Sequence, residues 1–151
     1  MKTFLCHSFE LDSEAHQAAW RLRDEVLRKP LGTSVPHIDP KDEARSHHLG
    51  CFLQVEHGET LVGTLILMPL DKTTVKMRQV AISPEYRNLG LGAQLVRFAE
   101  DFAREKGFTT MTAHARAVVI EFYRRLGYTI GEDMFIEVTI PHYHISKKLV
   151  G

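Results

Sequence analysis

The chain has 151 residues, of which 44% are hydrophobic, so it can bury a core, and we expect one domain over 1–151. Lysine plus arginine and aspartate plus glutamate both number 19, which leaves a formal net charge of +0 and no basic excess for a nucleic-acid partner. The two cysteines have no metal-type spacing, and the sequence contains no long apolar segment and no signal-peptide pattern. These features favour a protein of the reducing cytoplasm with no membrane span.

The N-terminal part predicts a strand followed by a helix. Residues 3–9 form the strand, and Asp12 or Ser13 can cap the first N–H groups of the helix. The helix is expected to end near Lys29, because the proline that follows disfavours helical backbone in the residue before it. Its Trp20 is expected to pack and not to contact a ligand.

Prolines make residues 30–49 the least regular part of the sequence. One short helical turn is expected over 39–44, with Asp39 as its cap and a proline at its first position. The pair His47-His48 is a weak metal candidate, because adjacent residues in a strand point to opposite faces.

Three antiparallel strands are predicted between residues 50 and 82. A hairpin turn at 57–59 follows the first strand, the second spans 60–69 and the third spans 75–82. The second strand is almost wholly apolar, so we expect it in the centre of a sheet.

The third of these strands leads into a turn that contains two glycines. Residues 87–92 (Arg-Asn-Leu-Gly-Leu-Gly) precede a helical pattern of apolar residues three and four apart. The first N–H groups of a helix carry partial positive charge and lack partners within the helix, so they bind phosphate well. Gly90 and Gly92 let a ligand approach the backbone, and Arg87 adds a positive charge. The turn is a candidate cradle for an oxyanion or pyrophosphate; a plain strand-to-helix turn is the alternative.

Two other phosphate-binding motifs are excluded. The chain contains no G-x-x-x-x-G-K-[ST] segment, and G-x-G-x-x-G fails because Gly92 is followed by Ala-Gln-Leu.

The C-terminal part predicts two helices and three strands. The helix after the glycine turn runs to about Lys106 and stops at a glycine, and a strand follows over 108–113. A strand, a helix and a strand in this order imply a parallel pair. A second helix over 116–126 and strands over about 128–137 and 142–149 complete the chain.

Residues 87–92 match the Arg/Gln-x-x-Gly-x-Gly/Ala signature of the GNAT superfamily of acyl-CoA-dependent N-acetyltransferases. Residues 122–128 (Phe-Tyr-Arg-Arg-Leu-Gly-Tyr) resemble the family's Phe-Tyr-x-x-x-Gly-Phe/Tyr segment. Residues 137–142 (Glu-Val-Thr-Ile-Pro-His) are similar to the Glu-x-Gly-Ile-Pro-His ending of the ElaA-like branch, from which Thr139 departs. The resemblance covers roughly residues 50 to 148.

The resemblance implies an α/β (α+β) fold: a mixed, mostly antiparallel sheet flanked by about four helices, with a splayed parallel pair at the cofactor site. It also implies acetyl-CoA as co-substrate, with its pyrophosphate at the glycine turn and its pantetheine arm along the strand before it. The expected cofactor-binding residues are Val80, Ala81, Ile82, Arg87, Asn88, Leu89, Gly90, Leu91, Gly92, Arg116 and Tyr123. Arg116 stands where the family usually has asparagine and the ElaA-like branch glutamine, so its contact cannot be carried over.

Acetyl transfer to an amine needs a base for the amine proton, a donor for the oxyanion and an acid for the thiolate. The resemblance assigns the acid to Tyr123, since a phenol with an ordinary pKa of ~10 can donate to a thiolate. His142, or His144 two residues on, is a candidate base; a structural or substrate-recognising role is the alternative for His142. Glu137 and Gln79 are further candidates to line the acceptor side. No cysteine lies in a nucleophile motif, so a direct ternary-complex transfer is expected.

The acceptor is expected to be a small-molecule or peptide amine, with no nucleic acid, membrane or metal involved. His142 and His144 share a strand face, but two ligands do not make a metal site. The chain is expected to be a monomer or a homodimer. Two alternatives stay open: an acyl-CoA sensor or structural module without turnover, and a binding domain for another phosphorylated ligand.

Overall fold

A seven-stranded sheet forms the centre of the computed structural model, which describes residues 1–32 and 35–150. The strand order is β1-β2-β3-β4-β5-β7-β6. The strands are β1 (Phe4–Phe9), β2 (His47–Val55), β3 (Gly58–Pro69), β4 (Thr74–Ile82), β5 (Thr110–Arg116), β6 (Thr129–Glu137) and β7 (Ile140–Lys148). Neighbouring strands are antiparallel except for the parallel pair β4–β5. The mixed, mostly antiparallel sheet expected from the sequence is therefore confirmed.

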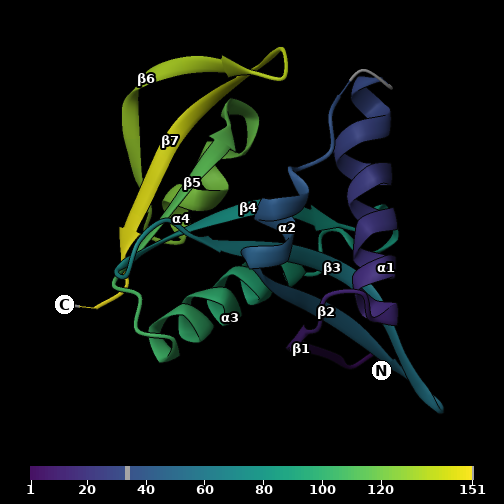
Figure 1. The fold of residues 1–151 in the computed structure, drawn as a ribbon. Helices are drawn as coiled ribbons and strands as arrows, with labels where there is room; N and C mark the ends of the chain where they lie inside the picture. The colour runs from purple at the N-terminus through teal and green to yellow at the C-terminus, as the bar shows by residue number, and fades with distance from the viewer. Residues whose placement is uncertain (33–34, 151) are drawn as a thin grey trace.

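Helices cover both faces of this sheet. The α-helices are α1 (Glu14–Arg23), α2 (Pro40–Arg45), α3 (Leu91–Glu105) and α4 (Ile120–Arg125). A π-helical stretch (Asp24–Arg28) and a 3-10 turn (Lys29–Leu31) continue α1, and further 3-10 turns cover Pro84–Tyr86 and Ala117–Val119. In Figure 1, α3 lies on one side of the sheet and α1 and α2 lie on the other. No helix in the described part of the chain is long and apolar enough to cross a membrane.

Both helices on the second face begin where the sequence predicts a cap. The Ser13 side chain accepts a hydrogen bond from the backbone N–H of His16 at the start of α1. The Asp39 side chain accepts one from the N–H of Lys41 at the start of α2. Each cap satisfies a donor that has no partner inside its helix.

The central strand β3 is buried on both faces, as its apolar sequence predicts. Its Leu65 and Leu67 belong to the main core, which the apolar side of α3 covers through residues such as Leu95. Ile66, between them, is also buried, and α1 packs against β3 with Ala19 buried beneath it. Alternate residues of one strand thus serve the two layers that Figure 1 shows.

A β-bulge distorts β4 in its second half. The register with β3 shifts by one residue between Thr64 and Ile66, so two residues of β4 stand opposite Leu65. Gln79 lies at the bulge and has a φ of 59°. A bulge bends its strand and increases the local twist. It therefore turns the end of β4 away from its parallel neighbour.

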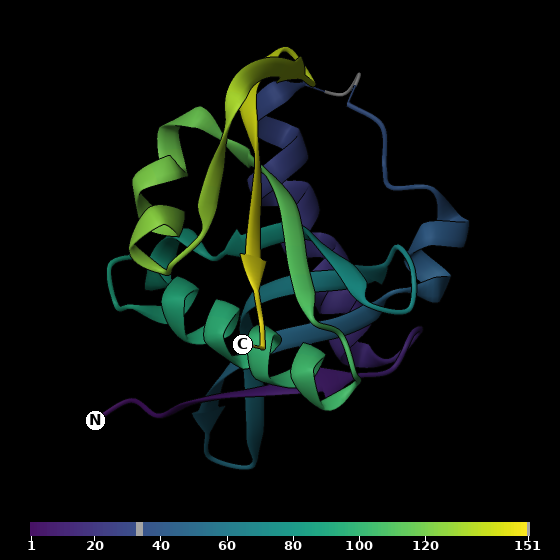
Figure 2. The same ribbon diagram turned by 90° about the vertical axis from the view of Figure 1, so that its left-hand side faces the viewer.

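The parallel pair separates at the same place. Among the described residues, the pairing of β4 with β5 ends at Met77 and Ala113, while β5 continues to Arg116 beside β7. Figure 2, turned by 90°, shows β7 in yellow running down the front of the molecule beside β5. The splayed parallel pair expected from the sequence is present.

Three predicted boundaries are wrong. His47 begins β2 and does not belong to an irregular segment, because it pairs with Leu67 on β3. Arg116 ends β5 and does not begin a helix, because it pairs with His142 on β7. The last strand begins at Ile140, two residues earlier than expected. In each case a distant cross-strand partner, which local sequence does not reveal, extends the strand.

Candidate active site

The glycine turn leads directly into α3 and leaves the start of that helix uncapped. Gly90 is the N-cap residue with a φ of 78°, and no side chain accepts a hydrogen bond from the first N–H groups. Asn88 also has a positive φ, of 64°. Arg87 is exposed and donates from Nε to the carbonyl of Ile82 at 3.3 Å. Unlike α1 and α2, α3 therefore presents its N-terminal donors to an external acceptor.

Both glycines suit a close approach of a ligand to this helix. A Cβ on Gly90 would meet nothing within 4 Å, so the space above its backbone is open. A Cβ on Gly92 would lie 3.3 Å from the ring of Phe122, so a larger residue there would press on α4. These features fit the pyrophosphate of a coenzyme, which requires N–H donors and an unobstructed backbone.

The N-terminal strand lies beside this turn, which the sequence did not indicate. The ring of Phe4 packs edge-on against Tyr86 with 6.0 Å between ring centres, and Lys2 Nζ lies 5.2 Å from the centre of the Tyr86 ring. Gln94 on α3 donates to the carbonyl of Phe4 at 3.5 Å. A second positive charge thus lies near the turn that carries Arg87.

The expected pantetheine strand has one paired and one open edge. Ala81 is buried and pairs with Thr64, and Ile82 pairs with Gly63 on β3. On the side toward β5 these residues lie beyond the last parallel pair. Val80 and Ile82 are half-buried and pack against the main core. The open edge therefore has backbone groups available for an extended ligand.

Tyr123 belongs to α4, and its side chain is part of the core and 7% exposed. Burial raises the pKa of its hydroxyl to about 12, so it keeps its proton at physiological pH. Its ring meets Tyr128 edge-on at 5.6 Å. The hydroxyl of Tyr128, unlike that of Tyr123, donates a hydrogen bond to the carboxylate of Glu100, at 2.9 Å.

The structure brings Arg116 and His142 together as cross-strand partners. His142 is 6% exposed, and its Nδ1 lies 2.8 Å from the carbonyl of Ile140, to which it donates. Its Nε2 lies 3.6 Å from Glu137 Oε2 on β6. The imidazole is therefore fixed in orientation, with Nε2 beside a carboxylate.

Glu137 also reaches a histidine that sequence analysis missed. Its Oε1 lies 3.1 Å from Nδ1 of His114 on β5, and Lys76 Nζ on β4 lies 3.4 Å from the same nitrogen. His114 and His144 are cross-strand partners on β5 and β7. The alternation of Thr112, His114 and Arg116 along a strand was the available signal.

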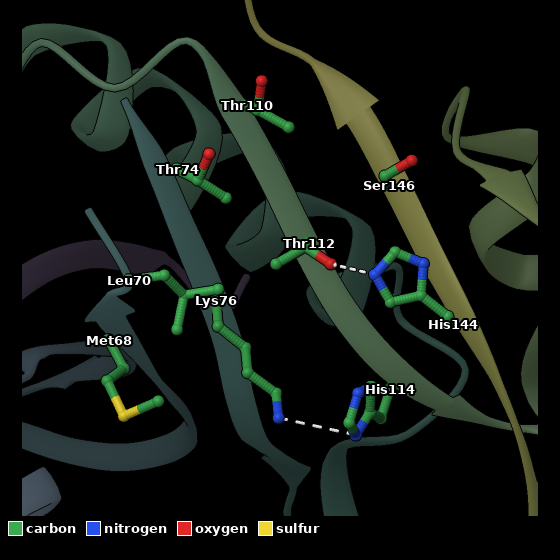
Figure 3. Close-up of a pocket in the computed structure, with 9 residues that line it drawn as sticks. All are labelled: Met68, Leu70, Thr74, Lys76, Thr110, Thr112, His114, His144 and Ser146. Atoms are coloured by element: carbon green, nitrogen blue, oxygen red, sulfur yellow. Dashed lines mark hydrogen bonds between the residues drawn. The ribbon is translucent and has the colours of Figure 1, made fainter. Parts of the chain in front are cut away.

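A cavity of about 360 Å³ opens on this face of the sheet (Figure 3). Its lining comes from β3, β4, β5 and β7 and the first residue of the turn after β3: Met68, Leu70, Thr74, Lys76, Thr110, Thr112, His114, His144 and Ser146. His144 Nε2 lies 2.7 Å from the Thr112 hydroxyl, which itself donates to the carbonyl of Ile145. Thr112 therefore accepts from His144, whose Nε2 carries the proton.

A separate buried cluster joins α1, α2 and β2. His16, Glu43 and His48 have ligand atoms within 4.8 Å of one another, which is a spacing that metal ligands also have. However, His16 Nδ1 accepts from the N–H of Asp12, so its Nε2 carries a proton and donates to Glu43. Arg23 donates to both carboxylate oxygens of Glu43. These bonds engage the carboxylate and both His16 nitrogens in a hydrogen-bond network, while Nδ1 of His48 has no hydrogen-bond partner among the described residues.

Comparison with known proteins agrees with this architecture. The model of the acetyltransferase (GNAT) family matches residues 11–128. A candidate acetyltransferase of Bacillus subtilis (strain 168) is 28% identical over 131 residues, which are 86% of this chain and 87% of that protein. YyaT from the same organism is 36% identical over 76 residues, and the match spans 50% of this chain and 51% of that protein.

Solved structures show the same fold over almost the whole chain. A crystal structure of a candidate N-acetyltransferase from Lactobacillus plantarum has a TM-score of 0.82 and 26% identity, and covers 99% of both chains. Escherichia coli ElaA has a TM-score of 0.78 and 19% identity, with 98% of this chain and 100% of that chain covered. A GNAT acetyltransferase from Elizabethkingia anophelis, with acetyl-CoA bound, has a TM-score of 0.70 and 12% identity over 96% and 97% of the chains.

The uncapped N-terminus of α3, the splayed strands beside it and the family match over residues 11–128 lead to one conclusion. This chain belongs to the GNAT acetyltransferase family and has the fold of an acyl-CoA-dependent acyltransferase.

Proposed function

We propose that the protein transfers the acetyl group of acetyl-CoA to a primary amine by direct attack in a ternary complex. The observation that carries the proposal is the uncapped start of α3 beside the open edge of β4. The family relative crystallised with acetyl-CoA supports the choice of co-substrate. No covalent acetyl-enzyme is required.

The glycine turn holds the pyrophosphate in this proposal. Donors come from the backbone of Arg87, Asn88, Leu89, Gly90, Leu91 and Gly92, and the Arg87 side chain adds charge. Val80, Ala81 and Ile82 supply the strand edge along which the pantetheine arm lies. Arg116 ends β5 beyond the last residue that pairs with β4, and in this proposal its side chain contacts the pantetheine.

The chemical step needs one proton acceptor and one proton donor. His142 takes the proton of the amine through Nε2, and Glu137 stabilises the resulting imidazolium. The neutral nitrogen then bonds to the acetyl carbon to give a tetrahedral oxyanion, and the collapse of this oxyanion breaks the carbon–sulfur bond. The second proton leaves the nitrogen through solvent and replaces the one that Tyr123 gives up. A backbone N–H near Val80 to Ile82 stabilises the oxyanion, and Tyr123 gives its proton to the departing thiolate.

Isothermal titration of acetyl-CoA into the parent protein and into Gly90→Glu tests the turn. The added carboxylate should repel the pyrophosphate and abolish measurable binding. Gly107→Glu is the matched control, because Gly107 also has a positive φ (93°) and open space around its Cβ, but follows the other end of α3. Both substitutions place a glutamate at a positive φ. If Gly107→Glu still binds acetyl-CoA, the loss of binding in Gly90→Glu is therefore due to its place in the glycine turn. If the folded parent protein does not bind acetyl-CoA, the proposed function is wrong.

A further inference from the structure

We infer that the acceptor is a small amino acid whose carboxylate lies one or two carbons from the reacting amine. The inference rests on the proposed function and adds the class of the acceptor. It comes from the distribution of charge on the open face of the sheet, where Lys76, His114 and Glu137 lie in a row.

Lys76 supplies a cation with no carboxylate partner. Its neighbour along β4, Arg78, lies on the same face and is paired with Asp42 on α2 at 3.3 Å. Lys76 has no carboxylate oxygen within 4.0 Å among the described residues, and its nearest polar neighbour is His114. It is half-buried, and its pKa is lowered by burial and then by Arg78, while the more distant carboxylates of Glu137 and Asp42 act in the opposite direction. A partly desolvated ammonium that no carboxylate of the described residues contacts directly favours an anionic ligand.

Glu137 supplies the opposite charge at the other end of the row. Its carboxylate is shared between His114 and His142 and is 43% exposed, so a ligand ammonium can reach it. Lys76 Nζ and Glu137 Oε1 both contact the same nitrogen of His114, at 3.4 Å and 3.1 Å. The ammonium of Lys76 and the carboxylate of Glu137 are therefore separated only by the Nδ1 atom of His114. A ligand that neutralises both needs its amine and its carboxylate equally close together.

The row also has a direction that suits the reaction. Lys76 lies opposite Thr112, on the part of β4 that is still paired with β5. Glu137 contacts His142, which pairs with Arg116 at the separated end of β5. An amino acid bound with its carboxylate on Lys76 would point its amine toward the separated strands, where the thioester is expected.

The cavity beside Lys76 and His114 accommodates a small molecule, and Glu137 lies outside its lining, on the far side of His114. Its volume of about 360 Å³ is that of a compact ligand, and Met68 and Leu70 form an apolar wall opposite His144 (Figure 3). Figure 3 shows the Lys76 side chain lying along this cavity and reaching His114. A short side chain of the acceptor would pack on Met68 and Leu70.

A matched series of amines tests whether the acceptor needs a carboxylate at the end opposite its reacting amine. The series is β-alanine, β-alaninamide, taurine and 2-aminoethylphosphonate, with glycine and glycinamide as the shorter pair. Release of the CoA thiol is followed at saturating acetyl-CoA. We expect kcat/KM for β-alanine or glycine to exceed that of its amide at least about tenfold. The sulfonate and phosphonate separate a carboxylate site from a general anion site.

Variants of Lys76 test whether this side chain binds the acceptor carboxylate. Lys76→Met should raise KM for the carboxylate acceptor about tenfold, with kcat and acetyl-CoA affinity unchanged, and Lys76→Arg should retain most of the affinity. Lys41→Met, an exposed lysine on α2 that does not line the cavity, is the control. Saturation-transfer NMR with β-alanine and the enzyme–CoA complex gives a second readout that needs no turnover, and its signal should fall in Lys76→Met.

The outcomes separate the two proposals. Transfer to amines regardless of a carboxylate, or an unchanged KM in Lys76→Met, would overturn the acceptor class and leave the acetyltransferase standing. Transfer to the sulfonate and phosphonate but not the carboxylate would also overturn it. Failure to bind acetyl-CoA would overturn the proposed function itself. A saturation-transfer signal from β-alanine with the protein alone, lost in Lys76→Met, would then retain the carboxylate site without the acetyltransferase.

Discussion

Arg23 and Glu43 form a two-pronged ion pair in the interior, with guanidinium-to-carboxylate distances of 2.8 and 2.9 Å. Both residues are about 95% buried, and they join α1 to α2. His16 adds a third donor to the same carboxylate, at 2.6 Å. This pair holds the helical segments over the sheet face that carries the candidate acceptor cavity.

Replacing the shared carboxylate should therefore be costly. In Glu43→Gln, Arg23 keeps its charge in a buried position without an anion, which destabilises a protein by about 3–5 kcal/mol. Urea denaturation should show this loss in the free energy of unfolding. Glu25→Gln, an exposed site in the helical stretch after α1, should change it by less than about 0.5 kcal/mol. A loss below about 1 kcal/mol for Glu43→Gln would contradict the network.

The same cluster makes stability depend on pH. Burial opposes the Glu43 charge, but the bonds from Arg23 and His16 prevail and hold its pKa below the ordinary value. Its stabilisation is present above the unfolded pKa of about 4.3 and is lost as pH falls through the folded pKa.

Burial lowers the pKa of His48, so the unfolded chain takes up that proton first below about pH 6.5. The free energy of unfolding should begin to fall below about pH 6.5 and fall further in acid. His48→Gln should reduce the slope between about pH 6.5 and 5, and an unchanged slope would exclude His48 as its source.

Tyr123→Phe tests the acid. If Tyr123 protonates the thiolate, kcat for any accepted amine should fall about 100-fold while acetyl-CoA affinity stays constant. Because burial raises its pKa to about 12, the parent should lose no activity through this group up to about pH 10. Tyr128→Phe is the control, since it removes the bond to Glu100 and should lower stability and not kcat. Unchanged turnover in Tyr123→Phe would show that another group protonates the thiolate.

The β6–β7 hairpin offers a stabilising change. Glu137 pairs with Ile140, so Val138 and Thr139 form a two-residue turn, and both have a positive φ, of 50° and 63°. Such turns favour Asn-Gly, and β-branched residues are strained in them. Val138→Asn with Thr139→Gly should stabilise the protein by about 1–2 kcal/mol, measured by thermal unfolding. Thr60→Gly, within β3, should destabilise it, and a destabilised hairpin variant would contradict the strain.

The sequence predicted features that depend on neighbouring residues. The two caps, the apolar central strand and the glycine turn before α3 all arise within a few positions of the chain. The resemblance then supplied the topology, because the motif at 87–92 occurs within one known fold. The parallel pair was expected from the order of strand, helix and strand, and its separation was expected from the resemblance.

Features that depend on strand register were missed. Arg116 was placed on a helix because nothing near it in the sequence reveals its partner His142. The bulge at Gln79 has no glycine to signal a positive φ. His114 was overlooked, because its relation to Glu137 requires β5, β7 and β6 to be aligned first. The roles of these residues remain predictions.

Register also brings the two cysteines together. Cys6 on β1 and Cys51 on β2 are direct cross-strand partners, although the sequence separates them widely. A hydrogen bond from the Cys51 thiol lowers the pKa of Cys6 and raises that of Cys51. Cys51 is 0% exposed, whereas Cys6 is half-buried. Cys6 should therefore carry more thiolate and be more accessible.

Iodoacetamide at pH 7 should alkylate Cys6 at least about tenfold faster than Cys51 in the folded protein, as followed by peptide mass spectrometry. Cys51→Ala removes the hydrogen-bond donor, so the pKa of Cys6 should rise and its alkylation should slow. The difference between parent and variant should disappear in urea, where the strands no longer align the two thiols. Equal rates for both cysteines in the folded parent, or a faster Cys6 in Cys51→Ala, would show that the hydrogen bond does not control the reactivity of Cys6.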